Sequence, residues 1–187
     1  MWSARGWTGI RVAARLAVVA MLGGLTAGCF HPMYAAHTDG TPALREKLRG
    51  VEIPPLNYPN ASHEARLGVE IRNALAFKLY GEATGDAPTH RLVLRLTTNR
   101  SDLIVDPTTA LPSVESYGID ANYSLIDIAS GKSVMTGNTF SRVSFDDARQ
   151  LQRFARARAV RDAEDRAAQE IADNIQTRLA SFFSAGT

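Results

Sequence analysis

The sequence predicts an α+β fold in two layers, with two helices packed on one face of a mostly antiparallel four-stranded sheet. Two segments alternate strictly between two sets of residues, which is typical of strands with one face in the core and one in water. Two other segments repeat apolar residues every three or four positions, as amphipathic helices do. The elements follow the order strand, helix, three strands, helix. This βαβββα order favours a two-layer α+β sandwich.

The first two predicted elements are a short strand and a helix. Val51 to Ile53 form a short run rich in β-branched residues, and Pro54-Pro55 ends it because proline cannot continue a ladder. We therefore expect a short edge strand. Ser62 is a typical helix N-cap, and Gly81 and Gly85 are typical of a helix end. The apolar residues between them recur with helical spacing: Leu67, Ile71, Ala74, Leu75 and Leu79.

Three strands are predicted next. Residues 91–97 alternate, with leucine at every second position, and residues 117–125 alternate in the same way. Between them, residues 101–115 contain two prolines and several serines and threonines, which favours a long loop. Residues 129–132, Ala-Ser-Gly-Lys, have the composition of a tight hairpin turn. The fourth strand, over residues 133–145, should therefore run antiparallel to the third.

A long helix is predicted from about residue 148 to residue 183. Its apolar stripe is rich in alanine, so the helix can approach the sheet closely. Five arginines cluster near its start, and acids follow them, so ion pairs along a solvated face are expected. The alternative for these arginines is a contact with anionic lipid headgroups or a protein partner. The stripe consists of Val160, Ala163, Ala167, Ile171, Ile175, Leu179 and Phe182.

The first 28 residues are predicted to be an export signal. They contain three arginines, no acid, and an apolar run from Leu16 to Leu25 before a few small residues. At ~1.5 Å per residue this run is roughly 15 Å long as a helix, about half of a bilayer core. Without the segment, 18 Lys and Arg stand against 19 Asp and Glu, a net charge of −1. This balance predicts no bulk affinity for nucleic acid.

Cys29 is the only cysteine in the chain, and it follows the predicted signal directly. The residues Thr26-Ala27-Gly28-Cys29 resemble the lipobox of bacterial lipoproteins. This resemblance implies cleavage after Gly28, a diacylglyceryl thioether on Cys29 and acylation of the new amino terminus. The alternative is an ordinary cleaved signal followed by a free thiol. We expect a lipidated tether over residues 29–50 and a single α+β domain over residues 51–187.

The residues that an enzyme or a metal centre requires do not form recognisable patterns. The sequence contains no G-x-S-x-G, P-loop or G-x-G-x-x-G motif. The acids at Asp146-Asp147 and at Asp162 to Asp165 are typical of a loop and a helix surface. We therefore expect no catalysis, no metal and no cofactor. The four histidines are scattered without metal-ligand spacing: His31, His37, His63 and His90.

Several short motifs together resemble one family of bacterial lipoproteins. Cys29 is followed by Phe30-His31-Pro32-Met33-Tyr34, the third strand contains Tyr123-Ser-Leu-Ile-Asp127, and the turn contains Ser130-Gly131-Lys132. The last helix contains Phe154-Ala155-Arg156-Ala157-Arg158. With the βαβββα order, these motifs are similar to the lipopolysaccharide-assembly lipoprotein family LptE, and more narrowly to its alphaproteobacterial branch. The family's usual glycine after the cysteine is absent, and Met33 replaces a leucine.

The resemblance implies a lipoprotein of the cell outer membrane, lipid-anchored on the periplasmic side. Such a protein sits inside or against a large outer-membrane β-barrel, the lipopolysaccharide-assembly translocon. It helps that barrel to fold and takes part in delivering lipopolysaccharide to the outer leaflet. Phe30 stands where an inner-membrane retention signal has Asp, which favours the outer membrane. The alternative function is a periplasmic lipoprotein that binds small lipids for a transport system, which requires a closed apolar pocket of ~300–1,000 Å³.

Four basic residues are candidate contacts for lipopolysaccharide or for the protein partner. Lipopolysaccharide carries phosphates, so its site requires Lys and Arg near apolar surface. Arg91, Arg95 and Arg100 flank one predicted strand, and Lys132 lies at the predicted hairpin tip. The alternative is that these charges are exposed only to keep the sheet edges soluble.

Overall fold

The computed structural model describes residues 43–81, 87–105, 107–108, 112–146 and 153–185. The predicted export signal, Cys29 and most of the predicted tether lie outside these residues. Within the described residues, three helices and four strands follow one another: α2 (Leu44–Arg49), β1 (Val51–Glu52), α3 (His63–Leu79), β2 (His90–Val105), β3 (Pro112–Asp127), β4 (Ser133–Asp146) and α4 (Arg153–Ser184).

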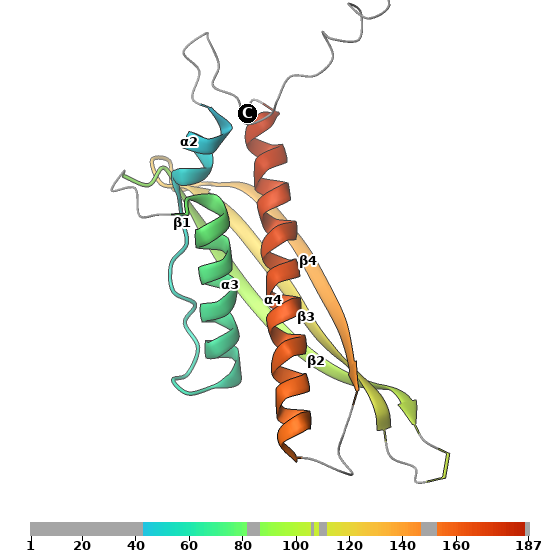
Figure 1. Cartoon of the computed structure of the whole chain (residues 1–187). Helices are drawn as coiled ribbons and strands as arrows, with labels where there is room; N and C mark the ends of the chain where they lie inside the picture. The colour runs from blue at the N-terminus through green and yellow to red at the C-terminus, as the bar shows by residue number, and fades with distance from the viewer. Residues whose placement is uncertain (1–42, 82–86, 106, 109–111, 147–152, 186–187) are drawn as a thin grey trace, which may run out of the picture.

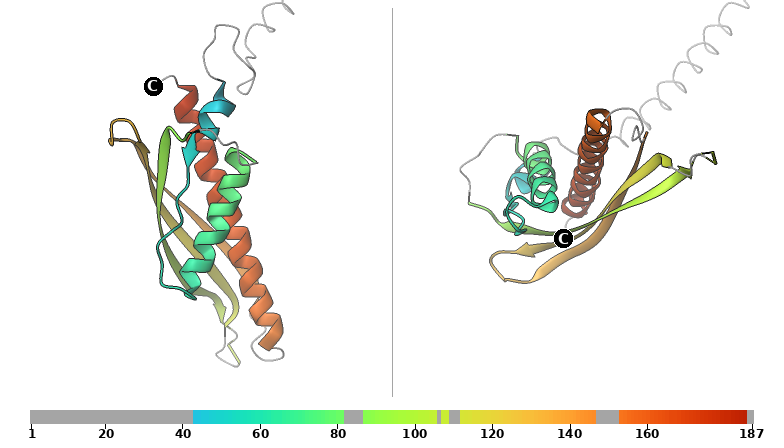
Figure 2. Two further views of the ribbon diagram at one scale, coloured as in Figure 1. Left: turned by 90° about the vertical axis from the view of Figure 1, so that its left-hand side faces the viewer. Right: turned by 90° about the horizontal axis from the view of Figure 1, so that it is seen from below.

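The domain has two layers, which confirms the predicted α+β class. The strands lie in the order β1-β2-β3-β4, and α3 and α4 lie side by side over one face of the sheet (Figure 1, Figure 2). The pairs β2–β3 and β3–β4 are antiparallel, whereas β1 runs parallel to β2. The sheet is therefore mixed. The parallel pair forms because α3 connects β1 to β2 as a crossover.

The β2–β3 hairpin is much longer than the sequence predicts. Its ladder extends from the pair His90↔Asp127 to the pair Val105↔Pro112, with bulges near Ile104. The prediction of a loop over residues 101–115 is therefore wrong at both of its ends. Pro112 is tolerated because it is the first residue of its strand, and the run Leu103 to Val105 consists of good strand formers.

Helix α3 begins and packs as its sequence predicts. The Ser62 side chain accepts a hydrogen bond from the Ala65 N–H at 3.0 Å, which is the predicted N-cap. Gly81 follows the helix with a φ of +69°, a left-handed conformation that favours glycine. The whole predicted stripe from Leu67 to Leu79 is buried.

Helix α4 crosses the sheet and contributes most of the helical core. Its alanine-rich stripe is buried from Val160 to Leu179 and packs against α3, β3 and β4. At the C-terminal end Phe183 is buried, while Phe182 is only partly buried. The predicted stripe is thus confirmed except for its last position.

The domain begins earlier than residue 51, the boundary expected from the sequence. Residues Leu44–Arg49, expected in the tether, form helix α2. Leu44 and Leu48 are four residues apart, so both lie on one face of α2 and both are buried in the main core. Gly50 then leads directly into β1, which pairs with the start of β2. Helix α2 therefore belongs to the folded domain.

Candidate functional site

The four basic candidates do not share one surface. Leu92 and Leu94 are buried under the helices, so the alternation of strand β2 points Arg91 and Arg95 to the opposite, uncovered face. Arg100 has the parity of the leucines and lies on the helix side. Lys132 is exposed at the β3–β4 turn. Only Arg91, Arg95 and Lys132 therefore remain as candidates for a shared contact.

Arg100 takes part in a polar cluster between the helices and the sheet. The centre of this cluster is Glu164 of α4, whose side chain is only 3% exposed. Its carboxylate accepts from Arg66 of α3 and from Arg100 at 3.4 Å, and it lies 2.8 Å from His63 Nε2. The sequence placed this acid on a helix surface, which is wrong because its position on α4 lies between buried alanines.

Tyr117 closes the cluster from strand β3. Its hydroxyl lies 3.0 Å from His63 Nε2, and the Arg100 guanidinium lies 5.5 Å from the centre of its ring. Burial raises the pKa of Tyr117 to about 12, and the negative charge of Glu164 adds to the effect. The phenol is therefore neutral at physiological pH. The cluster joins α3, α4, β2 and β3, so Arg100 contributes to packing the helices on the sheet.

A second buried acid fixes the start of α4. The side chain of Glu115 on β3 is 3% exposed, and Arg156 donates to its Oε1 at 3.2 Å. One arginine of the predicted basic cluster is thus turned toward the sheet, whereas Arg158 is exposed. Asp162 and Arg166 form the expected ion pair four residues apart, at 2.8 Å.

The uncovered face of the sheet is mostly polar. Arg91 pairs with Glu52 at 2.9 Å, and Arg142 holds Asp120 with two hydrogen bonds. The half-buried side chains of Val93 and Ile126 add a small apolar area beside Arg91 and Arg95. Phe140 pairs with Asp120 and is 65% exposed on this face, with the Arg142 guanidinium 5.5 Å from the centre of its ring. Short polar side chains make up much of the rest of the face: Thr97, Asn99, Asn122, Ser124, Thr136 and Asn138.

The far end of the β2–β3 hairpin exposes apolar side chains. Leu103, Ile104 and Val105 are 54%, 56% and 50% exposed, and this end of the hairpin projects beyond the helices (Figure 1). Phe154, at the start of α4, is 88% exposed at the same end of the domain. Sequence reasoning missed this apolar end because it treated residues 101–115 as a loop. The run of three strand-forming residues was the signal that could have identified it.

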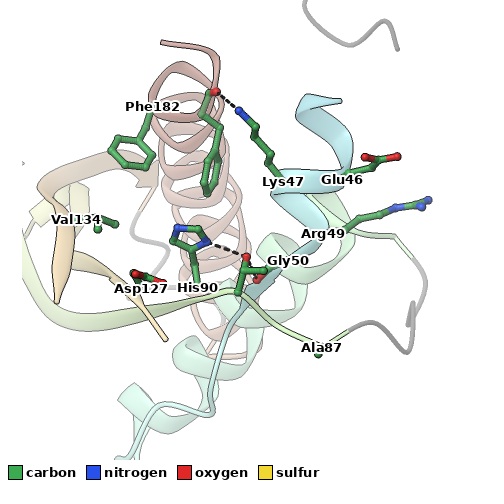
Figure 3. Close-up of a pocket in the computed structure, with 11 residues that line it drawn as sticks. Glu46, Lys47, Arg49, Gly50, Ala87, His90, Asp127, Val134 and Phe182 are labelled. Atoms are coloured by element: carbon green, nitrogen blue, oxygen red, sulfur yellow. Dashed lines mark hydrogen bonds between the residues drawn. The ribbon is translucent and has the colours of Figure 1, made fainter. Parts of the chain in front are cut away.

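A cavity of about 920 Å³ lies at the opposite end of the domain. Figure 3 shows it between helix α2, the C-terminal end of α4 and the beginnings of β2 and β4. Phe182, Phe183 and Val134 line it with apolar surface, and His90 packs edge-to-face on Phe183. Lys47 crosses its rim, where it donates to the Phe183 carbonyl at 3.2 Å.

The described residues contain no group of three or more His, Cys, Asp or Glu side chains that could hold a metal ion. Among the helices in this part of the chain, none is long and apolar enough to cross a membrane.

The two-layer α+β fold of this domain also occurs in a solved bacterial lipoprotein structure. A lipoprotein from Caulobacter crescentus CB15 is similar with a TM-score of 0.62 and 22% identity, over 78% of this chain and 98% of that chain. Rare lipoprotein B from Shewanella oneidensis is similar with a TM-score of 0.47 and 19% identity, over 71% of this chain and 92% of that chain. A minor lipoprotein from Acinetobacter baumannii is similar with a TM-score of 0.47 and 12% identity, over 70% of this chain and 88% of that chain.

The chain belongs to the LptE family of lipopolysaccharide-assembly proteins, whose family model matches residues 48–179. This match confirms the family that the sequence motifs indicate. A search among curated proteins found no match.

Proposed function

We propose that this protein is an outer-membrane lipoprotein that associates with a large β-barrel and assists its assembly and the delivery of lipopolysaccharide to the outer leaflet. The family membership supports lipopolysaccharide assembly as the process. In this proposal the protein acts as a binding partner without catalysis. Acylated Cys29 anchors it on the periplasmic side of the membrane.

The observation that carries the barrel contact is the apolar end of the β2–β3 hairpin. Single exposed apolar side chains are common on protein surfaces. Three consecutive ones are unfavourable in water unless a partner covers them. Leu103, Ile104 and Val105 form such a run, and the ladder with β3 holds it in an extended shape. A preformed apolar end of this kind can dock with little loss of conformational entropy.

The proposed contact with lipopolysaccharide lies on the uncovered sheet face at Arg91 and Arg95 and extends to Lys132 at the β3–β4 turn. Guanidinium groups bind phosphate with paired hydrogen bonds, and Val93 and Ile126 supply apolar surface beside them. The ion pair of Arg91 with Glu52 is exposed to water and therefore weak, so a phosphate can replace the carboxylate.

Affinity capture tests the barrel contact. A C-terminally tagged chain is purified from detergent-solubilised membranes, and the co-purifying proteins are identified and quantified. We expect one large β-barrel protein in about equal amount, and we expect Ile104→Asp to lose it. Val69→Asp is the matched control, because Val69 is equally exposed but lies on α3. Equal capture by both variants would show that the apolar end is not the contact.

Direct binding of purified lipopolysaccharide tests the sheet-face contact. The double variant Arg91→Glu and Arg95→Glu should weaken binding at least roughly tenfold, since each charge-assisted hydrogen bond contributes about 1.5–3 kcal/mol. Arg158→Glu and Arg161→Glu together are the control, because both residues are exposed on α4. An equal loss in the two double variants would contradict a specific contact at Arg91 and Arg95.

The cavity at the α2 end favours a second candidate function, the binding of small lipids for a transport system. Its volume of about 920 Å³ is in the range of ligand pockets. It lies at one end of the domain, because the buried leucine and alanine side chains fill the space between the helices and the sheet. Capture of inner-membrane transporter subunits, or of lipid without a barrel protein, would support this function in place of the first.

A further inference from the structure

The cavity at the α2 end has a mixed lining, in which Phe182, Phe183 and Val134 are apolar and charged residues of α2 and Asp127 of β3 are polar. The phenyl rings of Phe182 and Phe183 contact each other edge-to-face, and Val134 of β4 lies across from Phe182 (Figure 3). Lys47 bridges part of the rim to α4 through the Phe183 carbonyl. Apolar surface in a hollow of this size stabilises whatever apolar group fills it, because water leaves both surfaces.

The N-terminal end of the described residues lies beside this cavity. The described residues begin at Ala43. Helix α2 follows directly and contributes Lys47 to the cavity wall. Eight residues, 35–42, separate this point from the apolar segment Phe30-His31-Pro32-Met33-Tyr34. Eight extended residues span at most about 29 Å, and Gly40 and Pro42 permit a turn. The segment can therefore reach the cavity from outside.

An occupant that is part of the same chain needs little intrinsic affinity. A short linker holds a tethered segment at an effective concentration in the millimolar range. Phe30, Met33 and Tyr34 supply three large apolar side chains, and Met and aromatic side chains pack well on aromatic rings. The eight connecting residues include His37, Thr38, Asp39 and Thr41, which are polar and suited to stay in water.

We propose that the segment Phe30–Tyr34 of this chain docks into the cavity formed by α2, the end of α4 and the beginnings of β2 and β4. Cys29 precedes the docked segment directly, so an acylated Cys29 holds this end of the domain against the membrane. The apolar end of the β2–β3 hairpin, at the opposite end of the domain, then points away from the anchor (Figure 1). Docking requires neither the barrel nor lipopolysaccharide.

Cysteine cross-linking in the full-length chain tests the docking. Met33→Cys combined with Val134→Cys is oxidised in isolated membranes, and the bridged peptides are identified by mass spectrometry. We expect a disulfide between residues 33 and 134 in most of the protein. The matched control combines Met33→Cys with Phe140→Cys, since Phe140 is also exposed on β4 but about 20 Å further along the strand. Val134→Cys alone detects any bridge to Cys29.

The cross-linking gives two outcomes that would overturn the proposal. Equal bridging to residues 134 and 140 would mean that the segment samples the surface without a fixed site. Absence of bridging to residue 134, with acyl chains or membrane lipid recovered from the cavity, would mean that a lipid occupies it.

Tryptophan fluorescence provides a second readout that leaves the cavity intact. Trp2 and Trp7 are the only tryptophans of the sequence, and both lie in the export signal whose cleavage after Gly28 is predicted, so Tyr34→Trp is the single reporter in the mature chain. We expect a blue-shifted emission typical of a buried indole. The further change Val134→Asp should shift the emission to the red, whereas Phe140→Asp should not. A solvent-exposed emission in the starting variant would contradict docking, as would identical spectra for the two aspartate variants.

Discussion

Two buried carboxylates, Glu164 and Glu115, connect the helices to the sheet at the level of single residues. Each has a side chain only 3% exposed, and each accepts from an arginine that remains partly in water. A buried charge without a partner is costly, so these pairs determine which arrangement of helix and sheet is allowed. They therefore contribute more to the geometry of the domain than to its total stability.

Removal of Glu164 should destabilise the domain. Glu164→Ala leaves Arg66, Arg100 and His63 without their shared acceptor, and we expect a loss of about 1–3 kcal/mol. The partial exposure of the arginines keeps the loss below that of a fully buried pair. Urea unfolding measures it. Asp162→Ala removes an exposed acid of the same helix and should cost under about 1 kcal/mol. Equal losses for the two variants would refute this role.

Alkaline pH should destabilise the domain through Tyr117. The pKa of Tyr117 in the folded state is about 12, above its usual value of 10.0. The stabilisation is thus complete below pH 10 and is lost as the pH rises toward 12, because only the unfolded phenol ionises in that range. The loss amounts to about 3 kcal/mol. The urea midpoint of unfolding should fall less between pH 8 and pH 11.5 for Tyr117→Phe than for the control Tyr80→Phe. An equal fall in the two variants would contradict the assignment of the pH effect to Tyr117.

At the level of elements, the β3–β4 turn determines the register of the edge hairpin. The Asp127 carboxylate accepts from the Ser130 hydroxyl at 2.7 Å and from the Ala129 N–H at 3.2 Å. These bonds hold the pKa of Asp127 below its usual value. Gly131 completes the turn with a φ of +69°. The turn composition that predicted the hairpin thus corresponds to a specific set of hydrogen bonds.

Replacement of Gly131 should test the backbone requirement of this turn. A Cβ at Gly131 meets open space, so Gly131→Ala costs only the left-handed backbone conformation, about 1 kcal/mol. The expected fall in Tm is roughly 2–4 °C for a domain of this size. The Tm of Gly131→Asn should fall less than that of Gly131→Ala, because asparagine tolerates the left-handed conformation better. A larger fall for asparagine than for alanine would exclude backbone strain as the cause.

Helix α2 should behave as part of the folded core. Leu48 is buried among the core residues, so Leu48→Ala removes packed methyl groups and should cost about 2–5 kcal/mol. Arg45→Ala, on the exposed side of the same helix, should change stability by less than about 0.5 kcal/mol. Chemical denaturation of both variants measures the difference. An unchanged free energy of unfolding for Leu48→Ala would mean that residues 44–49 belong to the tether and not to the folded core.

At the level of the whole molecule, the domain has two chemically different ends. One end holds helix α2 and the cavity, and the other exposes the apolar strand ends of the hairpin. A polar sheet face with Arg91 and Arg95 lies between them. A domain built in this way can be held at one end and contact a partner at the other.

Loss of the anchor should separate attachment from folding. We expect Cys29→Ala to leave the domain folded and to release the protein from the membrane fraction. Two or three acyl chains anchor firmly, whereas one anchors only marginally. Cell fractionation measures the distribution, and circular dichroism checks the fold. A Cys29→Ala protein that stays in the membrane fraction would mean that the contact with the partner is sufficient.

The sequence alone determined the α+β class, the presence and order of α3, β2, β3, β4 and α4, and the family, but not how far β2 and β3 extend. Periodicity, caps and turns act over a few neighbouring residues, so they can be recognised without knowing the rest of the fold. The Ser62 cap and the Gly131 turn are examples.

Only the tertiary structure decided which charged residues are buried and where the domain begins. Glu164 and Glu115 are buried because arginines from distant segments meet them, and Leu44 and Leu48 are buried because α4 passes beside them. The apolar strand ends and the cavity depend likewise on where the helices stop relative to the sheet. These features follow from contacts between residues far apart in the chain, which no local pattern records.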